Sequence, residues 1–231
     1  MGIIANALTI ILGSLLGSGR KSKDSTRNYH ILGVSIIIIS LVGFFENVYN
    51  VEGENVVSEN LILVILSLLL GTKIGEWLRI EDHLSNLGNT ANQSVNAFLD
   101  AALYFGIGGL QISGPVLLAI NHDNSQLLIK CFLDAPFAVV FGATYGKVVA
   151  LSALPVAAVQ VVIALTAYFF SSFFSSDMIA GLCAMGYIIL FFSGFNLMTD
   201  GKHRVNNINM LPGILLVVLF NVIMSVMERV L

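Results

Sequence analysis

The stretch LLIKCFLDAPFAVVFGATYG, residues 127–146, is apolar enough to lie inside a membrane, yet it carries a lysine and an aspartate. Lys130 and Asp134 are four residues apart, so on a helix their side chains share one face and partly neutralise each other. An ionisable residue at bilayer depth costs roughly 2.5–3.5 kcal/mol on insertion scales and is rare without a role. The stretch therefore predicts a membrane-spanning helix with a polar centre at this pair.

The composition of the whole chain also favours a membrane protein. Its 231 residues are 56% hydrophobic and 11% charged, whereas soluble domains average about 25% charged residues. Each span needs about 20 mostly apolar residues, so the length allows seven or eight. We predict an all-α, polytopic transmembrane helix bundle, with residues 1–231 forming one integral membrane domain. The expected spans are 3–19, 29–47, 58–78, 96–120, 126–146, 148–170, 177–199 and 207–228.

The basic residues predict an orientation in the membrane. Lysine and arginine concentrate in cytoplasmic loops, and in this chain they follow the first, third, fifth and seventh expected spans. These residues are Arg20, Lys21, Lys23, Arg27, Arg79, Lys147, Lys202 and Arg204. Both termini are therefore expected outside the cytoplasm, and merging two spans would reverse the C-terminus.

Three expected spans end in the pattern Gly-x-x-x-Gly, which predicts close helix packing. The pairs are Gly13/Gly17, Gly71/Gly75 and Gly142/Gly146. Small residues four apart let helix backbones approach each other in lipid. Packing within the chain is the favoured interpretation, and association into a homodimer or other homo-oligomer is the alternative. The spacing Gly106…Ser113-Gly114 recurs at Gly186…Ser193-Gly194, which raises the hypothesis of an inverted repeat with interrupted helices.

The polar centre at Lys130 and Asp134 is a candidate binding site for a cation, a proton or an amine. Asp134 is about 12 Å from the start of its span at 1.5 Å per residue, close to the middle of a ~30 Å hydrocarbon core. Pro136 removes a backbone donor and is expected to free the carbonyl of Phe132 beside the acid. The structural alternative is that Lys130 reaches outward while Asp134 bonds a neighbouring helix.

The expected fourth span contains residues that interrupt helices. Gly106, Gly108, Gly109 and Gly114 lie in it with Gln111 and Pro115, and glycine costs about 0.8–1 kcal/mol against alanine inside a helix. We expect a break at Gly114-Pro115 that supplies backbone ligands to a cavity, with a kinked packing helix as the alternative. Four buried amides are also expected, and each is more simply explained as a hydrogen bond between helices. They are Asn6, Gln160, Asn196 and Asn221.

Several classes of function find no support in the sequence. The chain contains no nucleophile elbow, zinc-protease motif, phosphate-binding loop or dinucleotide fingerprint, so we expect neither an enzyme nor a bound cofactor. The histidines and cysteines lack metal-ligand spacing, and a metal site is not expected. The net charge of −3 offers no basic surface for nucleic acid.

Several segments of the chain are distinctive as sequence motifs. They include the opening M-x-x-x-x-N-A-x-x-I-I-L-G-S-L-L-G, LLLGTKIGE at 68–76 and KCFLDAPFAVVFG from Lys130, with SALPV at 152–156 and NMLPG at 209–213. In these motifs, which cover almost the whole chain, the sequence resembles a bacterial family of integral inner-membrane proteins, the YdfK/YqgA-like family of unknown function 554. The resemblance implies an inner-membrane location and a transporter of unspecified substrate. Gln111 and Pro115 depart from the pattern expected of the family.

These observations lead to one favoured function and one alternative. The favoured function is a transporter or channel for a small ion or polar solute, embedded in the lipid bilayer. Its binding residues are predicted to be Asp134, Lys130, Asn6, Gln111, Gly114 and Asn196. The alternative is a non-transporting membrane scaffold or regulatory protein that associates through the Gly-x-x-x-Gly faces.

Overall fold

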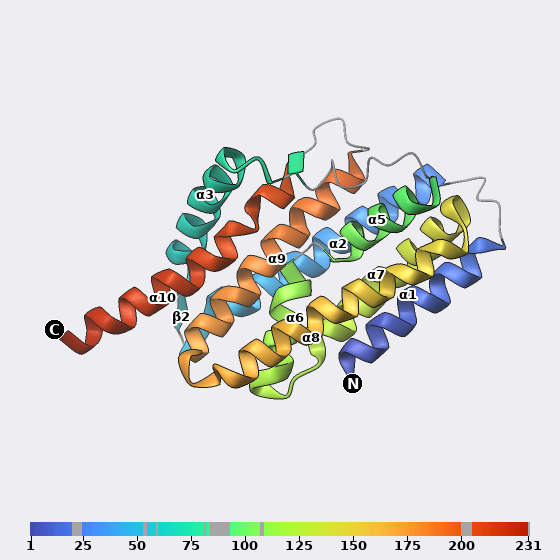
Figure 1. The fold of residues 1–231 in the computed structure, drawn as a ribbon. Helices are drawn as coiled ribbons and strands as arrows, with labels where there is room; N and C mark the ends of the chain where they lie inside the picture. Colours follow the sequence, from blue (N-terminus) through green and yellow to red (C-terminus); the bar gives the residue numbers. More distant parts are fainter. Residues whose placement is uncertain are drawn as a thin grey trace. The chain divides into compact units, whose positions relative to one another are not determined.

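The computed structural model describes residues 1–19, 25–52, 55–58, 60–80, 82–83, 93–106, 109–199 and 205–230, and these residues are mainly helical (Figure 1). The predicted all-α class is confirmed. The one departure is a small hairpin between the second and third helices, in which β1 (Tyr49–Glu52) pairs antiparallel with β2 (Asn55–Ser58). No strands were expected between the predicted spans 29–47 and 58–78.

Helices occupy every expected span position. They are α1 (Gly2–Ser18), α2 (Ser25–Val48), α3 (Leu61–Trp77), α5 (Gln93–Gly106), α6 (Gly109–Asn121), α7 (Ser125–Tyr145), α8 (Ala153–Phe169), α9 (Ser176–Met198) and α10 (Pro212–Val230). Short 3-10 turns complete the described elements: η1 (Lys147–Ser152), η2 (Ser171–Phe173) and η3 (Asn207–Met210).

Fewer helices in the described part of the chain have the length and composition of a membrane span than the seven or eight that we predicted. Within the described residues, 4 helical segments are long and apolar enough to cross a membrane, or up to 5 if a bent pair counts as one span. The segments are Ser125–Tyr145, Lys147–Phe169, Ser176–Met198 and Asn207–Met227, and the bent pair is Ala97–Gly106 with Gly109–Asn121. Gly2–Ser18 and Gly33–Val48 are apolar but shorter. Seven or eight spans are therefore not confirmed.

The expected orientation is not decided by the structure. The basic clusters at 20–23 and 202–204 lie outside the described residues, so the location of the N-terminus stays a prediction.

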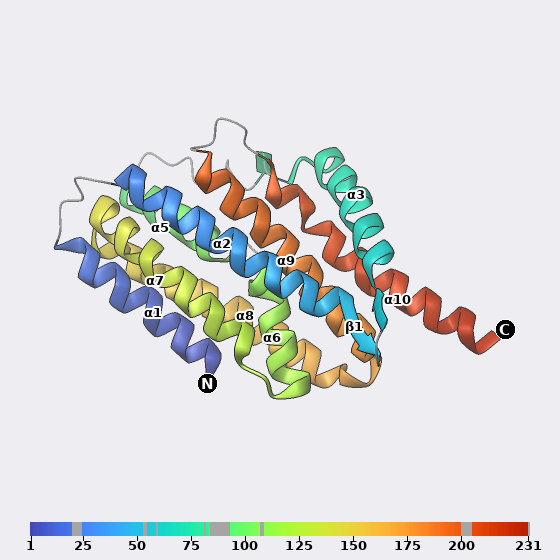
Figure 2. The ribbon, with the colours of Figure 1, turned by 180° about the vertical axis from the view of Figure 1, so that it is seen from behind.

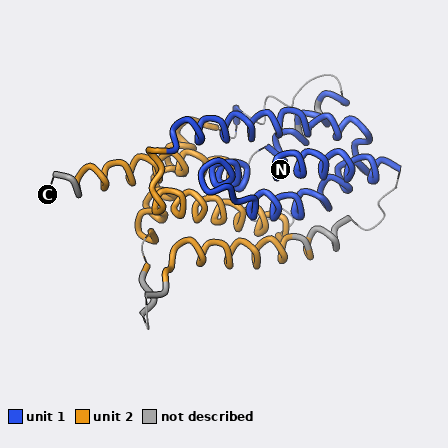
Figure 3. Tube along the Cα trace, turned by 90° about the horizontal axis from the view of Figure 1, so that it is seen from below, with its two compact units in different colours: residues 1–29, 82–171 blue, residues 30–81, 172–231 orange. Residues whose placement is uncertain are grey.

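The chain divides into two compact units, each assembled from segments far apart in the sequence. Unit 1 comprises residues 1–29 and 82–171, and unit 2 comprises residues 30–81 and 172–231 (Figure 3). Unit 1 contains α1, α5, α6, α7 and α8, whereas unit 2 contains α3, α9, α10 and most of α2. The prediction of a single domain over 1–231 stays a prediction.

In unit 1, α1 lies along α7 and runs in the same direction, as Figures 1 and 2 show from opposite sides. The two helices start together, where the Gly2 amide donates to Asn124 Oδ1 at 2.8 Å. Further along, a Cβ built at Gly13 would lie 2.7 Å from the Cβ of Ala138, and one built at Gly142 would lie 2.1 Å from the carbonyl oxygen of Ser14. The two backbones therefore touch, because both contact faces lack side chains.

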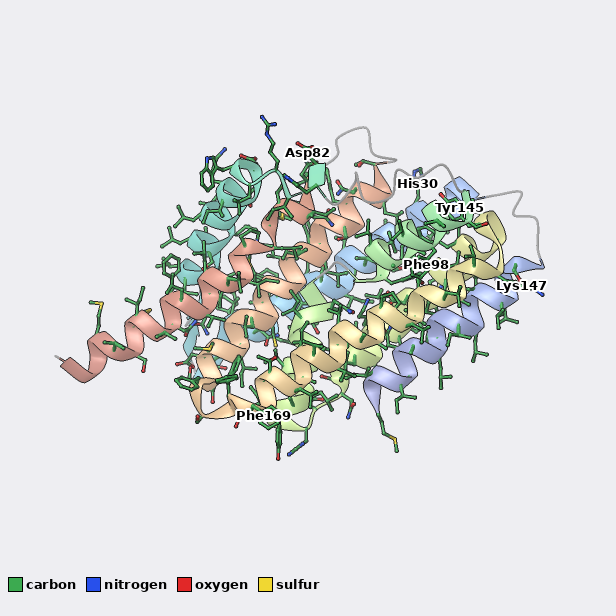
Figure 4. All side chains as sticks on the ribbon, in the orientation of Figure 1. His30, Asp82, Phe98, Tyr145, Lys147 and Phe169 are labelled. Atoms are coloured by element: carbon green, nitrogen blue, oxygen red, sulfur yellow. The ribbon has the colours of Figure 1, made fainter. Side chains whose placement is uncertain are left out.

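The hairpin of α7 and α8 is completed by a glycine turn. Gly146 ends α7 with φ +81° and donates its amide to the carbonyl of Gly142 at 2.9 Å. Only glycine adopts that backbone conformation without strain. In Figure 4, Tyr145 and Lys147 lie at this turn, and Phe169 lies at the opposite end of α8.

Unit 2 repeats the use of glycine at helix contacts. A Cβ built at Gly71 would lie 2.3 Å from the backbone of Gly213, and one at Gly75 would lie 2.1 Å from the carbonyl oxygen of Asn209. The Gly33 position likewise meets the backbone of α9 at Gly194. Thus both glycines of the α1 and α3 pairs and Gly142 of α7 contact other parts of the chain, which confirms intramolecular packing for them. A Cβ at Gly146 would meet nothing within 4 Å among the described residues, and this glycine ends α7 instead of packing against a helix. The homo-oligomer stays a prediction.

The interruption of the expected fourth span lies at a different place from the one we predicted. α5 ends at Gly106, and α6 begins at Gly109 and continues through Gly114 and Pro115. Three glycines within four residues each remove about 0.8–1 kcal/mol of helix propensity. One proline only removes a single donor, which packed membrane helices tolerate.

Candidate functional site

Lys130 and Asp134 form a buried ion pair in the first half of α7. The Lys130 Nζ lies 2.9 Å from Asp134 Oδ2, and each residue is 7% exposed. The same Nζ donates to the carbonyl oxygen of Phe105 at 2.9 Å. Phe105 is the penultimate residue of α5, directly before the break, where the last carbonyls of a helix lack partners and carry partial negative charge. The lysine is thus held inside the unit rather than reaching outward.

A chain of three side-chain amides extends the ion pair across four helices. Asn6 of α1 donates its Nδ2 to Asp134 Oδ2 at 2.7 Å. Gln160 of α8 donates its Nε2 to Asn6 Oδ1 at 3.2 Å and to Gln111 Oε1 at 2.9 Å. Gln111 of α6 in turn donates to the carbonyl oxygen of Val156 at 3.0 Å. All three amides are buried, at 0–1% exposure.

The two ends of this chain dictate how the amides are oriented. Asp134 and the Val156 carbonyl only accept hydrogen bonds, so Asn6 and Gln111 must each turn their NH₂ group outward. Their oxygens then face Gln160, whose NH₂ group supplies both of the donors they need. Gln160 Oε1 is consequently buried without a hydrogen-bond partner. Since buried polar groups are nearly always paired, this oxygen marks a place for a donor from a ligand or a water molecule.

The residues next to the ion pair on α5 and α7 include buried aromatic side chains. Phe105 and Phe137 are 0% and 3% exposed, and Tyr104 packs on Phe137 and Phe141 with ring centroids 4.9 and 5.0 Å apart. In such low-dielectric surroundings each charge depends strongly on its partner, and removing one side of a buried pair typically costs about 3–5 kcal/mol.

The structure brings together four of the six predicted binding residues. Asp134, Lys130, Asn6 and Gln111 belong to one hydrogen-bonded network. Gly114 instead contacts Leu127, because a Cβ at this position would lie 3.0 Å from Leu127 Cδ2. Gly114 thus permits α6 to approach α7, and it supplies no ligand to the network in the described residues.

Asn196 belongs to unit 2. Its Nδ2 donates to the carbonyl oxygen of Val205 at 2.7 Å, and its Oδ1 accepts from the Val205 amide at 2.7 Å. Both polar ends of the side chain are therefore used to hold the backbone that follows α9. Asn221 bonds the Val217 carbonyl of its own helix at 2.9 Å.

Two participants were not predicted as binding residues. Gln160 was expected only as a contact between helices, although a lone amide in the apolar sequence VAAVQVVIAL was a visible signal. The Phe105 carbonyl gave no sequence signal beyond its place before a glycine cluster. A smaller polar contact nearby joins Ser113 to Gln126 at 2.6 Å.

This arrangement can bind a cation or a small polar group that carries hydrogen-bond donors. A carboxylate and a backbone carbonyl point at one position, and an unpaired amide oxygen belongs to the same network. The described residues contain no cluster of three His, Cys, Asp or Glu side chains suited to a metal ion.

Comparisons with known proteins give a family but no activity. The family model described as "Protein of unknown function (DUF554)" matches residues 1–222. The chain is 29% identical over 225 residues to the uncharacterized membrane protein YdfK of Bacillus subtilis (strain 168), covering 93% of both chains. It is 25% identical over 238 residues to the uncharacterized protein YqgA of Escherichia coli (strain K12), covering 94% of both. No solved structure matches significantly.

Proposed function

We propose that this chain, which belongs to the DUF554 family of proteins of unknown function, transports a small cation or cationic solute across a membrane. The similarity to a membrane protein and the apolar helices fit an integral membrane protein. An inner-membrane location, with the N-terminus outside the cytoplasm, is part of the proposal.

One observation carries the proposal: the buried Lys130–Asp134 pair meets a free helix-end carbonyl at an interrupted helix. Ionisable residues inside membrane helices are costly and mark ion pathways and proton relays. Interrupted helices provide backbone oxygens for substrates and ions in many transporters. In this chain the Lys130 Nζ contacts both the Asp134 carboxylate and the carbonyl oxygen at the end of the interrupted helix.

The amide chain supports the same proposal. A network that only locked the helices together would satisfy all of its own polar groups, whereas Gln160 Oε1 is buried without a partner. The network therefore leaves one buried acceptor atom without a donor, as expected of a site that receives a donor from a ligand.

The scaffold alternative has less support. It requires Gly-x-x-x-Gly faces that are free to meet another protein, and these faces contact α1, α7, η3 and α10 inside the chain.

The test is cation flux into liposomes that contain the purified protein. Asp134→Asn keeps the size of the side chain and removes its charge, so we expect flux to fall at least tenfold. The matched control is Glu76→Gln, which makes the same chemical change in an ion pair with Lys73 whose two side chains are 79% and 51% exposed. We expect near wild-type flux from this control. A folded Asp134→Asn protein with unchanged flux, or no flux through the wild type under any cation gradient, would contradict the proposal.

A further inference from the structure

We infer that the Lys130 ammonium occupies a binding site for a monovalent cation such as Na⁺ or K⁺, and that the lysine and the free cation exclude each other. This inference rests on the proposed function and specifies how its site is regulated. In the structure the lysine acts as a tethered cation that keeps the site filled.

The ligands of Lys130 are those of a small hard cation. Its Nζ lies 2.9 Å from a carboxylate oxygen of α7 and 2.9 Å from a carbonyl oxygen of α5. Carboxylate and carbonyl oxygens are also the groups that bind alkali cations. The carbonyl is available because α5 ends one residue after Phe105, and the helix end adds partial negative charge.

The charge of the site makes the two occupants mutually exclusive. Helices α1, α6, α7 and α8 together contain two charged residues, Lys130 and Asp134, and α5, which supplies the Phe105 carbonyl, contains Asp100. With Lys130 in place the pair is neutral, so a second cation would leave one positive charge uncompensated in apolar surroundings. A free cation can therefore bind Asp134 only when the lysine withdraws. The flexible four-carbon stem of lysine allows this withdrawal.

The unpaired oxygen of Gln160 is a second, independent sign of an absent ligand. Gln160 is 0% exposed, and it reaches Asp134 through a single intervening residue, Asn6. Lysine already donates to Asp134 and Phe105 without satisfying this oxygen. A hydrated cation brings water donors into the network, and these can satisfy it.

The first test measures how readily Lys130 of the wild-type protein is acylated by a membrane-permeant amine reagent, using mass spectrometry. The protein is incubated with NaCl or KCl, or with N-methylglucamine chloride at equal ionic strength. Lys73 serves as the internal reference because its side chain is 79% exposed. We expect Na⁺ or K⁺ to raise Lys130 labelling at least threefold while Lys73 labelling stays constant. Labelling of Lys130 that is equal in all three salts would overturn the inference.

The second test removes the tethered cation. Lys130→Met leaves Asp134 without its counter-charge, so we expect NaCl or KCl to raise the melting temperature of this variant by several degrees. The double variant Lys130→Met/Asp134→Asn is the matched control and is expected to show no such rise. A Lys130→Met protein that folds and melts identically in all salts would refute the exchange. If this variant does not fold, the labelling of Lys130 in the wild-type protein alone tests whether a cation displaces the lysine.

The experiments distinguish a failure of the proposed transport from a failure of the proposed cation exchange. If flux depends on Asp134 but Lys130 labelling does not respond to cations, transport is supported and the exchange of Lys130 with a free cation is refuted. Labelling that responds to cations without any flux would support the cation site and discard transport.

Discussion

Substituting Gly142 by alanine should separate α1 from α7 and disturb the network at the same time. A Cβ at this position would lie 2.1 Å from the carbonyl oxygen of Ser14, whereas ordinary contacts begin at 3.4 Å. The obstacle is backbone, so no side-chain rotation relieves it. The two helices must therefore move apart by about 1 Å, which corresponds to overpacking that costs about 1–3 kcal/mol.

A separation of this size also affects Asn6, because its 2.7 Å bond to Asp134 joins the same two helices. An increase of about 1 Å takes the donor–acceptor distance beyond the range of a hydrogen bond. We therefore expect Gly142→Ala to lower both the unfolding free energy and the cation flux per folded molecule. The unfolding free energy is measured by reversible unfolding in mixed detergent micelles, and the flux in proteoliposomes.

The matched control is Gly19→Ala in the same unit, at the C-terminal end of α1. A Cβ there would meet nothing within 4 Å among the described residues. The φ of Gly19 is −94°, which alanine adopts without strain, so this variant should be as stable as the wild type. A Gly142→Ala protein within about 0.5 kcal/mol of the wild type would show that the α1–α7 contact is looser than the structure indicates, and would refute the reasoning.

Two further substitutions test the polar groups. Gln160→Leu removes the NH₂ group that donates to Asn6 Oδ1 and Gln111 Oε1. The unfolding free energy should fall by about 1–3 kcal/mol because these two acceptors become unpaired. An unchanged unfolding curve would mean that water replaces the lost donors. Asn196→Ala loses both bonds to Val205 and should lower the melting temperature while the cation response of Lys130 labelling stays at its wild-type value. Loss of that response would instead connect Asn196 to the site.

Helix positions were predictable because the apolar runs and their breakers are local properties of the sequence. Runs of about 20 apolar residues identified where helices lie, and the expected boundaries fall within a few residues of α1, α7 and α9. The place of the break in the fourth span was predicted wrongly, because the single proline was weighted above the glycine cluster. The hairpin at 49–58 was missed because a short connection carries little periodic signal.

The candidate site was only partly predictable, for a physical reason. Lys130 and Asp134 are one helical turn apart, so their pairing follows from the sequence alone. The contacts of Asn6 and Gln160 with each other span 154 residues, and no local pattern shows which buried amides meet. The role of the Phe105 carbonyl could not be predicted from the sequence, because every residue has a backbone carbonyl. Only the folded chain shows which carbonyl lacks a hydrogen-bond donor within its own helix.

The interleaving of the two units has a consequence for how the protein is made. α1 packs mainly against α7, which begins at Ser125, and the hydrogen bond from Asn6 to Asp134 and the contacts of Gly13 are made with that helix. At roughly 5–20 residues per second of synthesis, α1 must wait on the order of ten seconds in the nascent chain before that partner emerges. During this interval it presents an amide and bare backbone to its surroundings. The buried contacts of α1 therefore cannot form before residues 125–145 have been synthesised.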